Sequence, residues 1–207
     1  MKVLWLIGFT VVLVWSGINP KDQFTWFLEV LPTLIGLALL GATYKRFPLT
    51  PMLYGFILLH CWILMVGGHY TYAEVPAFDW LRDTFDMERN NYDKVGHFAQ
   101  GFIPALLARE ILIRREVVKS IAWTNVFIIS VCLAFSAFYE LIEWRVALIS
   151  GEDAEAFLGT QGYVWDTQSD MALALVGAIC SIIVLARWHD RQLSQLGSSS
   201  GRPHATA

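Results

Sequence analysis

The stretch NYDKVGHFAQG, residues 91 to 101, decides how this chain is interpreted. It places four polar side chains, Asp93, Lys94, His97 and Gln100, at the start of a segment that then becomes apolar. Asp93, His97 and Gln100 are spaced four and three residues apart, so a helix presents them on one face. At 1.5 Å per residue, Gln100 lies about 10 Å further along the helix axis than Asp93. If the apolar segment enters a membrane, this polar face therefore reaches below the membrane surface.

The composition supports a membrane protein. The chain has 207 residues, of which 56% are hydrophobic and 16% are charged, whereas an ordinary soluble domain has roughly 25% charged residues. The sequence contains no run of basic residues that would indicate binding to nucleic acid. The three cysteines lie far apart in apolar segments and match no metal or redox spacing, so we interpret them as small buried hydrophobic residues. We expect an all-α integral membrane protein that lies in a lipid bilayer.

Six apolar blocks are long enough to be transmembrane helices, for which a helix needs about 17 to 25 mostly apolar residues. The blocks are Val3 to Ile18, Phe24 to Thr43, Met52 to Gly68, Asp93 to Ile113, Ile121 to Trp144 and Thr167 to Ala186. The first block has no small-residue cleavage site after it, so we expect a retained helix, with a cleaved leader as the alternative. The sequence thus predicts one six-helix membrane domain over residues 1–190. We expect residues 191–207 to be a disordered cytoplasmic tail.

The loop between the third and fourth blocks contains a further helical pattern. Phe78, Leu81 and Phe85 repeat at three and four residues among charged side chains, and Pro76 is a typical helix start. Such an amphipathic segment is expected to lie in the membrane interface instead of crossing it.

The charges predict the orientation, because cytoplasmic loops of membrane proteins are enriched in Lys and Arg. With six crossings, one side of the membrane receives ten of the 15 basic residues and only three of the 18 acidic ones. We expect this side, which carries both termini, to be cytoplasmic. The opposite side then receives five basic and 15 acidic residues and is strongly negative.

Polar clusters distant in sequence meet at this acidic outer side. They stand at the end of the third block, the start of the fourth, the end of the fifth and the start of the sixth. Ionisable groups at membrane depth are costly and persist where they pair, bind an ion or face water. We expect His97, Glu140 and Glu143 to be catalytic. The expected binding residues are His69, Asp93, Lys94, Gln100, Asp166 and Asp170.

Simpler interpretations exist for several of these residues. Asp93 and Asp166 stand where helix N-caps are expected. Lys94 extends to the interface or pairs with Asp93. Glu29 is compatible with an ion pair to Lys21, and we assign it no role.

The strings GGHYTYAEVP, NNYDKVGHFAQGF, FYELIEW and GTQGYVWDTQSDM resemble the YjdF family of bacterial inner-membrane proteins, over residues 1 to about 190. The resemblance implies a multi-pass inner-membrane protein and implies no particular reaction. More loosely, the order of an Asp-Lys-x-x-His helix start, a Glu-bearing helix and an Asp-bearing last helix is similar to VanZ-like proteins, which are associated with glycopeptide resistance. By position, the matching residues are Asp93, Lys94, His97, Glu140 and Asp170. The chain departs from that family in two places. Ile142 and Glu143 follow Glu140 where that family tends to have a Gln a few residues on, and no Asn matches well after Asp170.

Three functions compete. The first is an enzyme or binding site for a lipid-linked or envelope substrate at the outer face, assisted by a divalent metal. Its metal ligands would be His97, Glu140, Glu143 and Asp170, and these donors suit Mg, Mn or Zn. The second is a structural lock between helices of a scaffold protein. The third is a small proton-coupled carrier, which the lack of ionisable groups near the midplane, apart from His60, disfavours.

Overall fold

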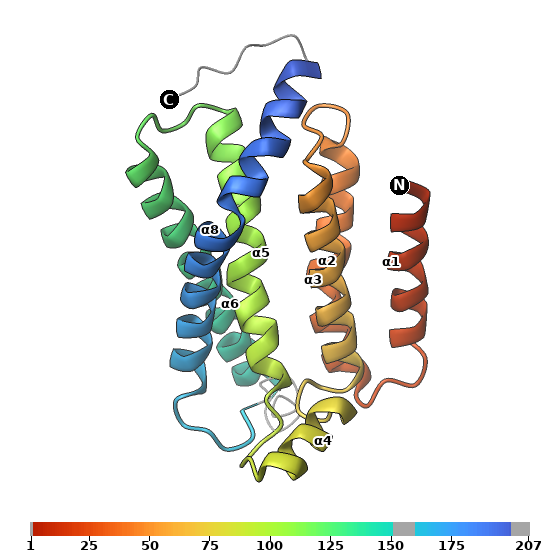
Figure 1. The fold of residues 1–207 in the computed structure, drawn as a ribbon. Coiled ribbons are helices and arrows are strands. Elements are labelled where there is room, and N and C mark those ends of the chain that lie inside the picture. The colour runs from red at the N-terminus through yellow and green to blue at the C-terminus, as the bar shows by residue number, and fades with distance from the viewer. Residues whose placement is uncertain (1, 151–159, 200–207) are drawn as a thin grey trace.

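The computed structural model describes residues 2–150 and 160–199, and over these residues the chain forms helices and no strands. The helices run up and down a bundle, with the short α4 lying across one end (Figure 1). Their bounds are α1 Lys2–Ser16, α2 Gln23–Thr43, α3 Pro51–His69, α4 Pro76–Phe85, α5 Tyr92–Arg114, α6 Ile121–Ser150 and α8 Asp166–Ser199. The predicted all-α fold is confirmed.

Four of these helices, α2, α3, α6 and α8, are long and apolar enough to cross a membrane. Helix α1 is apolar but has only 15 residues. Helix α5 is not among the candidates, and it carries Asp93, Lys94, Arg109, Glu110 and Arg114 within its 23 residues. Its central place in the bundle explains how it tolerates these side chains, since most of them face other helices and not the surroundings.

Two helices are longer than the sequence predicts. Helix α6 continues beyond Trp144, and α8 continues to Ser199, so the domain boundary expected at residue 190 falls inside α8. Residues 200–207 of the expected tail lie outside the described residues, as do residues 151–159. The helix predicted to start at Pro76 is present as α4, which buries no residue.

Helices α5 and α8 pack against each other most closely, because two glycines let their backbones touch. A Cβ atom at Gly101 would overlap the backbone of Ala174 on α8. A Cβ atom at Gly177 would overlap the backbone of Phe98 and lie 2.9 Å from the backbone nitrogen of Phe102 on α5. Small residues at such contacts are the usual means by which membrane helices approach. The α5–α8 pair is therefore a close-packed unit that also contacts α6 and α3.

The other half of the bundle consists of α1, α2 and α3, joined by indole hydrogen bonds. The Trp5 indole donates to the Tyr54 carbonyl at 2.7 Å, and the Trp62 indole donates to the Gly8 carbonyl at 3.1 Å. The Trp26 indole donates to the Ser16 hydroxyl at 3.1 Å. These bonds fix α1 against α2 and α3 in addition to the apolar cluster that Phe9 of α1 forms with Val30 of α2 and Met65 of α3.

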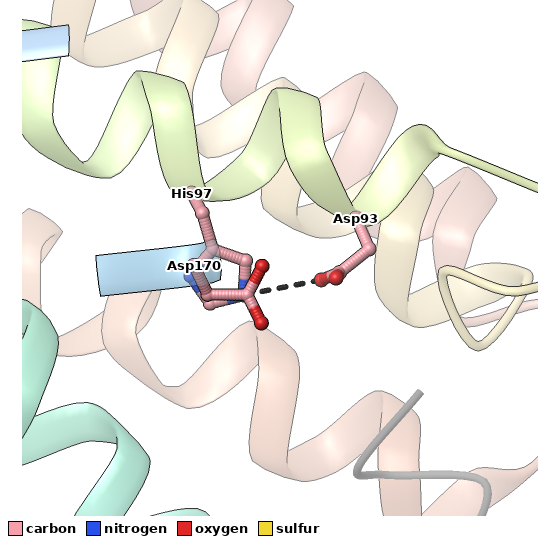
Figure 2. A group of neighbouring side chains, drawn as sticks. All are labelled: Asp93, His97 and Asp170. Carbon is pink, nitrogen blue, oxygen red and sulfur yellow. Dashed lines mark ion pairs between the residues drawn. The ribbon is translucent and has the colours of Figure 1, made fainter. Parts of the chain in front are cut away.

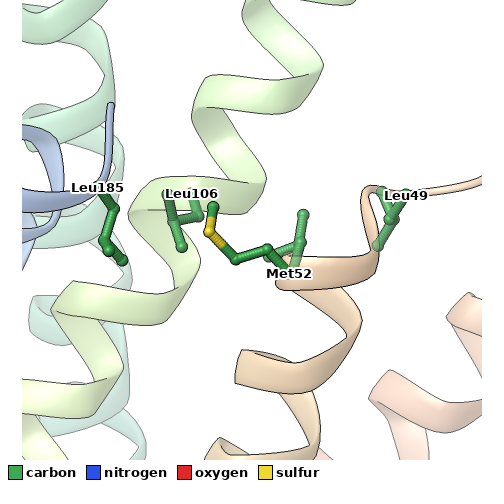
Figure 3. Packing of buried hydrophobic residues seen from close by; sticks show 5 residues of the cluster. Leu49, Met52, Leu106 and Leu185 are labelled. Atoms are coloured by element: carbon green, nitrogen blue, oxygen red, sulfur yellow. The ribbon is translucent and has the colours of Figure 1, made fainter. Parts of the chain in front are cut away.

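The two halves meet in an apolar cluster between α3, α5 and α8. Leu106 and Leu185 face Met52, with Leu49 beside it (Figure 3), and Leu53 completes the buried set. All five side chains are at most 7% exposed. This cluster holds the start of α3 against the α5–α8 pair.

Candidate functional site

His97 lies between two carboxylates at one end of the bundle, close to the start of α5 (Figure 2). Its Nε2 atom is 3.1 Å from Asp93 Oδ1 on the same helix and 3.8 Å from Asp170 Oδ2 on α8. Its other ring nitrogen, Nδ1, is 3.1 Å from Gln100 Oε1. One ligand atom from each of Asp93, His97 and Asp170 lies within 4.8 Å of the others, and all three residues are buried. This is a geometry that can hold a metal ion.

Further acidic side chains surround this group. Glu140 Oε1 on α6 is 3.9 Å from His97 Nδ1, and Glu143 is buried one helical turn further along α6. The structure therefore brings together the predicted catalytic residues His97, Glu140 and Glu143, with Asp93, Gln100 and Asp170 beside them. Their catalytic and binding roles stay predictions.

Three carboxylate oxygens of the group have no hydrogen-bond partner among the described residues. They are Asp93 Oδ2, Glu140 Oε1 and Asp170 Oδ1. Their residues are only 6%, 8% and 2% exposed, respectively. A buried polar atom left without a partner costs free energy, and a buried charge costs more. The arrangement is thus suited to receiving a cation or a hydrogen-bond donor.

Arg89, which the sequence interpretation missed, neutralises part of this charge. Its Nη1 atom is 2.6 Å from Asp166 Oδ1 on α8, and its Nη2 atom is 3.6 Å from Asp93 Oδ2. Arg89 is only 9% exposed. The spacing of four residues between Arg89 and Asp93 is typical of an ion pair on a helix. Arg89 precedes the predicted helix, however, so the sequence did not indicate this pair. Asp166, predicted as a binding residue or N-cap, serves as its partner.

The N-cap interpretation of Asp93 is wrong. Helix α5 starts at Tyr92 with Asn91 as its N-cap, and the Tyr92 amide donates to the Asn90 side chain at 3.1 Å. Asp93 instead occupies the first turn, where a carboxylate is favoured by the helix dipole. The partners of Asp93 are His97 and Arg89. The neighbouring Lys94 has its Nζ atom 5.9 Å from the centroid of the Tyr163 ring.

His69 and Glu29 have other partners than expected. His69 Nδ1 is 2.9 Å from the Ser16 carbonyl oxygen, and its ring packs on Trp15 of α1. Lys21 pairs with Glu74 at 2.8 Å and not with Glu29, and this hydrogen bond raises the pKa of Lys21 above its ordinary value. Glu29 is buried and accepts a hydrogen bond from the Tyr139 hydroxyl at 3.2 Å.

A cavity of about 470 Å³ extends from this polar group along α5. Asp93, His97 and Gln100 line its polar end together with Glu29 and Glu143. Its remaining wall is mostly apolar and comes from α2, α3, α5 and α6. Four of the predicted residues, Asp93, His97, Gln100 and Glu143, thus face a hollow inside the bundle.

A second polar cluster, which the sequence interpretation also missed, lies at the opposite end of α5. Glu110 and His189 are fully buried and are joined by His189 Nε2 and Glu110 Oε2 at 3.1 Å. Glu110 also accepts from Arg114 at 2.7 Å and from the Thr50 amide and hydroxyl at 3.1 and 2.9 Å. The Arg109 Nη2 atom donates a hydrogen bond to Asp190 Oδ1 at 2.7 Å. Neither Glu110 nor His189 has an unpartnered side-chain atom, so this cluster is a structural lock of α3, α5 and α8.

Comparison with known proteins agrees with the helical membrane architecture. Residues 1–191 match the family described as "Predicted membrane protein (DUF2238)". The chain belongs to this family. The chain is 52% identical over 192 residues to the inner membrane protein YjdF of Escherichia coli (strain K12). The matched residues cover 93% of this chain and 92% of the relative. The predicted YjdF resemblance is confirmed, and the location predicted from the sequence agrees with that of this relative.

No solved structure matches the chain. The looser similarity to VanZ-like proteins is not part of these findings and stays a prediction.

Proposed function

We propose that this chain is a six-span inner-membrane protein that binds a divalent cation at its outer end and uses it on a lipid-linked or envelope substrate. Figure 1 supports placing both termini on one side of the membrane, since the first turn of α1 and the last turns of α8 lie toward the same end of the bundle. The excess of Lys and Arg expected on that side favours the cytoplasm. The amphipathic α4 then lies at the outer interface. The description of the E. coli relative supports the inner membrane as its location.

The observation that carries the cation is the set of buried carboxylate oxygens around His97 that accept no hydrogen bond from the described residues. With Gln100 Oε1 as the acceptor, Nδ1 of His97 carries the hydrogen, and Nε2 presents its lone pair to the point between Asp93 and Asp170. A ligating histidine usually donates its second N–H to such a partner, which fixes the tautomer. Gln100 therefore acts as a positioning residue for His97 as a metal ligand.

The roles of the remaining carboxylates follow from their positions. Asp93, His97 and Asp170 provide three protein ligands, a number that leaves coordination positions open for water or substrate. Glu140 adjoins His97 on its Nδ1 side, and Glu143 lines the cavity, so both are placed to transfer protons or to add a ligand. The donor set of one imidazole and several carboxylates accepts Zn²⁺, Mn²⁺ or Mg²⁺.

The cation is tested by metal content. Detergent-purified protein is equilibrated with Zn²⁺, Mn²⁺ or Mg²⁺ separately, desalted and measured by mass spectrometry of the element. We expect about one ion per chain for one of these metals, and its loss in His97→Ala and in Asp170→Asn. Asp83→Asn, which changes an exposed carboxylate of α4, is the matched control and should retain the ion. Equal metal content in the wild type and both site variants would refute the cation site.

A second candidate function is a purely structural lock. It is favoured by the ion pairs from α5 and Arg89 to α8, with His97 protonated between Asp93 and Asp170. The two functions predict opposite effects of Asp170→Asn in metal-free protein. A lock loses a partner and unfolds at lower temperature, whereas an empty cation site loses carboxylate repulsion and unfolds at the same or a higher temperature.

A further inference from the structure

The cavity has two kinds of lining. One end carries Asp93, His97 and Glu143, and the other consists of apolar side chains, among them Ala108, Ile111 and Val131. Its volume of about 470 Å³ lies within the range of about 300 to 1,000 Å³ typical of small-molecule sites. We propose that this cavity is the binding groove of a lipid phosphate, which lays one hydrocarbon chain along α5 and α6 and places its phosphate at His97. The phosphate part of this proposal rests on the proposed cation.

The length of the groove matches a hydrocarbon chain that lies along the bilayer normal. Its lining residues on α5 extend from Asp93 to Ile111, which is about 27 Å of helix at 1.5 Å per residue. The hydrocarbon core of a bilayer is about 30 Å thick. Beyond Gln100 the α5 lining continues for 11 residues to Ile111, or about 16 Å, so the apolar part of the groove covers about half of that thickness, which is the depth that a lipid tail occupies in one leaflet.

The α6 side of the groove opens to the surroundings of the bundle. Phe135 and Phe138 line the cavity and are nevertheless 61% and 60% exposed, and Ile111 on α5 is 41% exposed. At this depth the surroundings are lipid, so a chain can enter sideways from the bilayer without leaving hydrocarbon. A water-soluble substrate would have no use for such an opening.

The polar end selects the head group. Glu29, Asp93, Glu140, Glu143 and Asp170 outnumber the basic groups nearby, so a free phosphate would be repelled. A divalent cation held by Asp93, His97 and Asp170 reverses this, because its open positions require oxygen ligands, and phosphate is the usual substrate ligand of such cations. Binding of the phosphate must therefore depend on the metal, while binding of the chain must not.

The test uses two photoreactive probes with the same long alkyl chain, one ending in a phosphate and the other in an alcohol. Each probe is cross-linked to the purified full-length protein, with the metal that binds or with a chelator, and captured protein is quantified. Ala108→Trp and Val131→Trp fill the groove from opposite walls. Ile183→Trp on α8, where the side chain is 75% exposed and does not line the cavity, is the control for an added tryptophan at membrane depth.

We expect each groove variant to reduce capture of both probes at least fivefold, with metal content unchanged, and Ile183→Trp to have no effect. In the wild type, the metal should increase capture of the phosphate probe over the alcohol probe severalfold. His97→Ala should abolish this preference and leave capture of the alcohol intact. The thermal midpoint of each variant shows that it is folded.

Three results would overturn the inference in separable ways. Equal capture by the wild type and both groove variants would eliminate the chain site while leaving the cation site standing on its metal content. Equal capture of phosphate and alcohol by metal-loaded protein would eliminate the phosphate head group. If the wild type holds no ion after equilibration with each metal and still captures the alcohol in the groove, the proposed cation and the phosphate are refuted together, and only the chain site is retained.

Discussion

His97 Nε2 on α5 lies 3.8 Å from Asp170 Oδ2 on α8, across a helix contact that Gly101 and Gly177 make possible. The two glycines lie four and seven residues beyond His97 and Asp170, on the same two helices. Any side chain at either position would separate the helices and with them the two ligand atoms. The site geometry thus depends on residues that contribute no chemistry.

Replacement of either glycine by leucine should therefore weaken the fold and the site together. Overpacking of a tight contact costs typically about 1 to 3 kcal/mol. We expect Gly101→Leu and Gly177→Leu to lower the thermal midpoint in detergent and to reduce metal content. Gly36→Leu and Gly41→Leu on α2 are matched controls, since nothing lies within 4 Å of a Cβ atom there. An unchanged midpoint for both α5–α8 variants would contradict the tight contact.

Arg89 should be more important for stability than an ordinary surface arginine. Arg89→Met leaves Asp166 and Asp93 without their base in a buried setting, and breaking such a pair costs about 3 to 5 kcal/mol. Arg82→Met, which removes partly exposed pairs to Asp79 and Asp83, should cost less, about 1 kcal/mol. Thermal and denaturant unfolding of both variants measure the difference, and equal losses would be evidence against a structural role of Arg89.

The Glu110 cluster should affect stability without affecting the cation. Glu110→Gln weakens the contacts to His189 and Arg114 in a fully buried position, so we expect a loss of about 3 to 5 kcal/mol. Asp190→Asn keeps an oxygen acceptor for Arg109 at a position that is 58% exposed, so it should cost less than Glu110→Gln. Folded Glu110→Gln protein should hold as much metal as the wild type. Loss of the ion without loss of stability would contradict a purely structural cluster.

The six-span topology is testable with single cysteines. The native Cys61, Cys132 and Cys180 are first replaced by alanine. Cysteines at Lys45 and Lys119 should then be shielded from a membrane-impermeant maleimide in intact cells, whereas cysteines at Asp86 and Gln161 should react. Permeabilised cells provide the control in which all four react. Labelling of Lys45→Cys in intact cells would show that the orientation is opposite to the one proposed.

The sequence by itself determined the class of the fold and most helix positions, because apolar run length and turn residues are local properties. The helix predicted over Asp93 to Ile113 corresponds to α5, and Pro76 does start α4. It also determined that Asp93, His97 and Gln100 share one face, which follows from helical periodicity alone.

Only the tertiary structure decided the partners of these residues. The position of Arg89 between Asp93 and Asp166 depends on how α5 and α8 approach, which two glycines distant in sequence control. For the same reason Glu110 and His189, which stand among basic residues in the sequence, proved to be buried. Contacts between helices arise from packing across the bundle, and no local pattern encodes them. The stretch NYDKVGHFAQG therefore acquires its carboxylate neighbours and its cavity only in the folded chain.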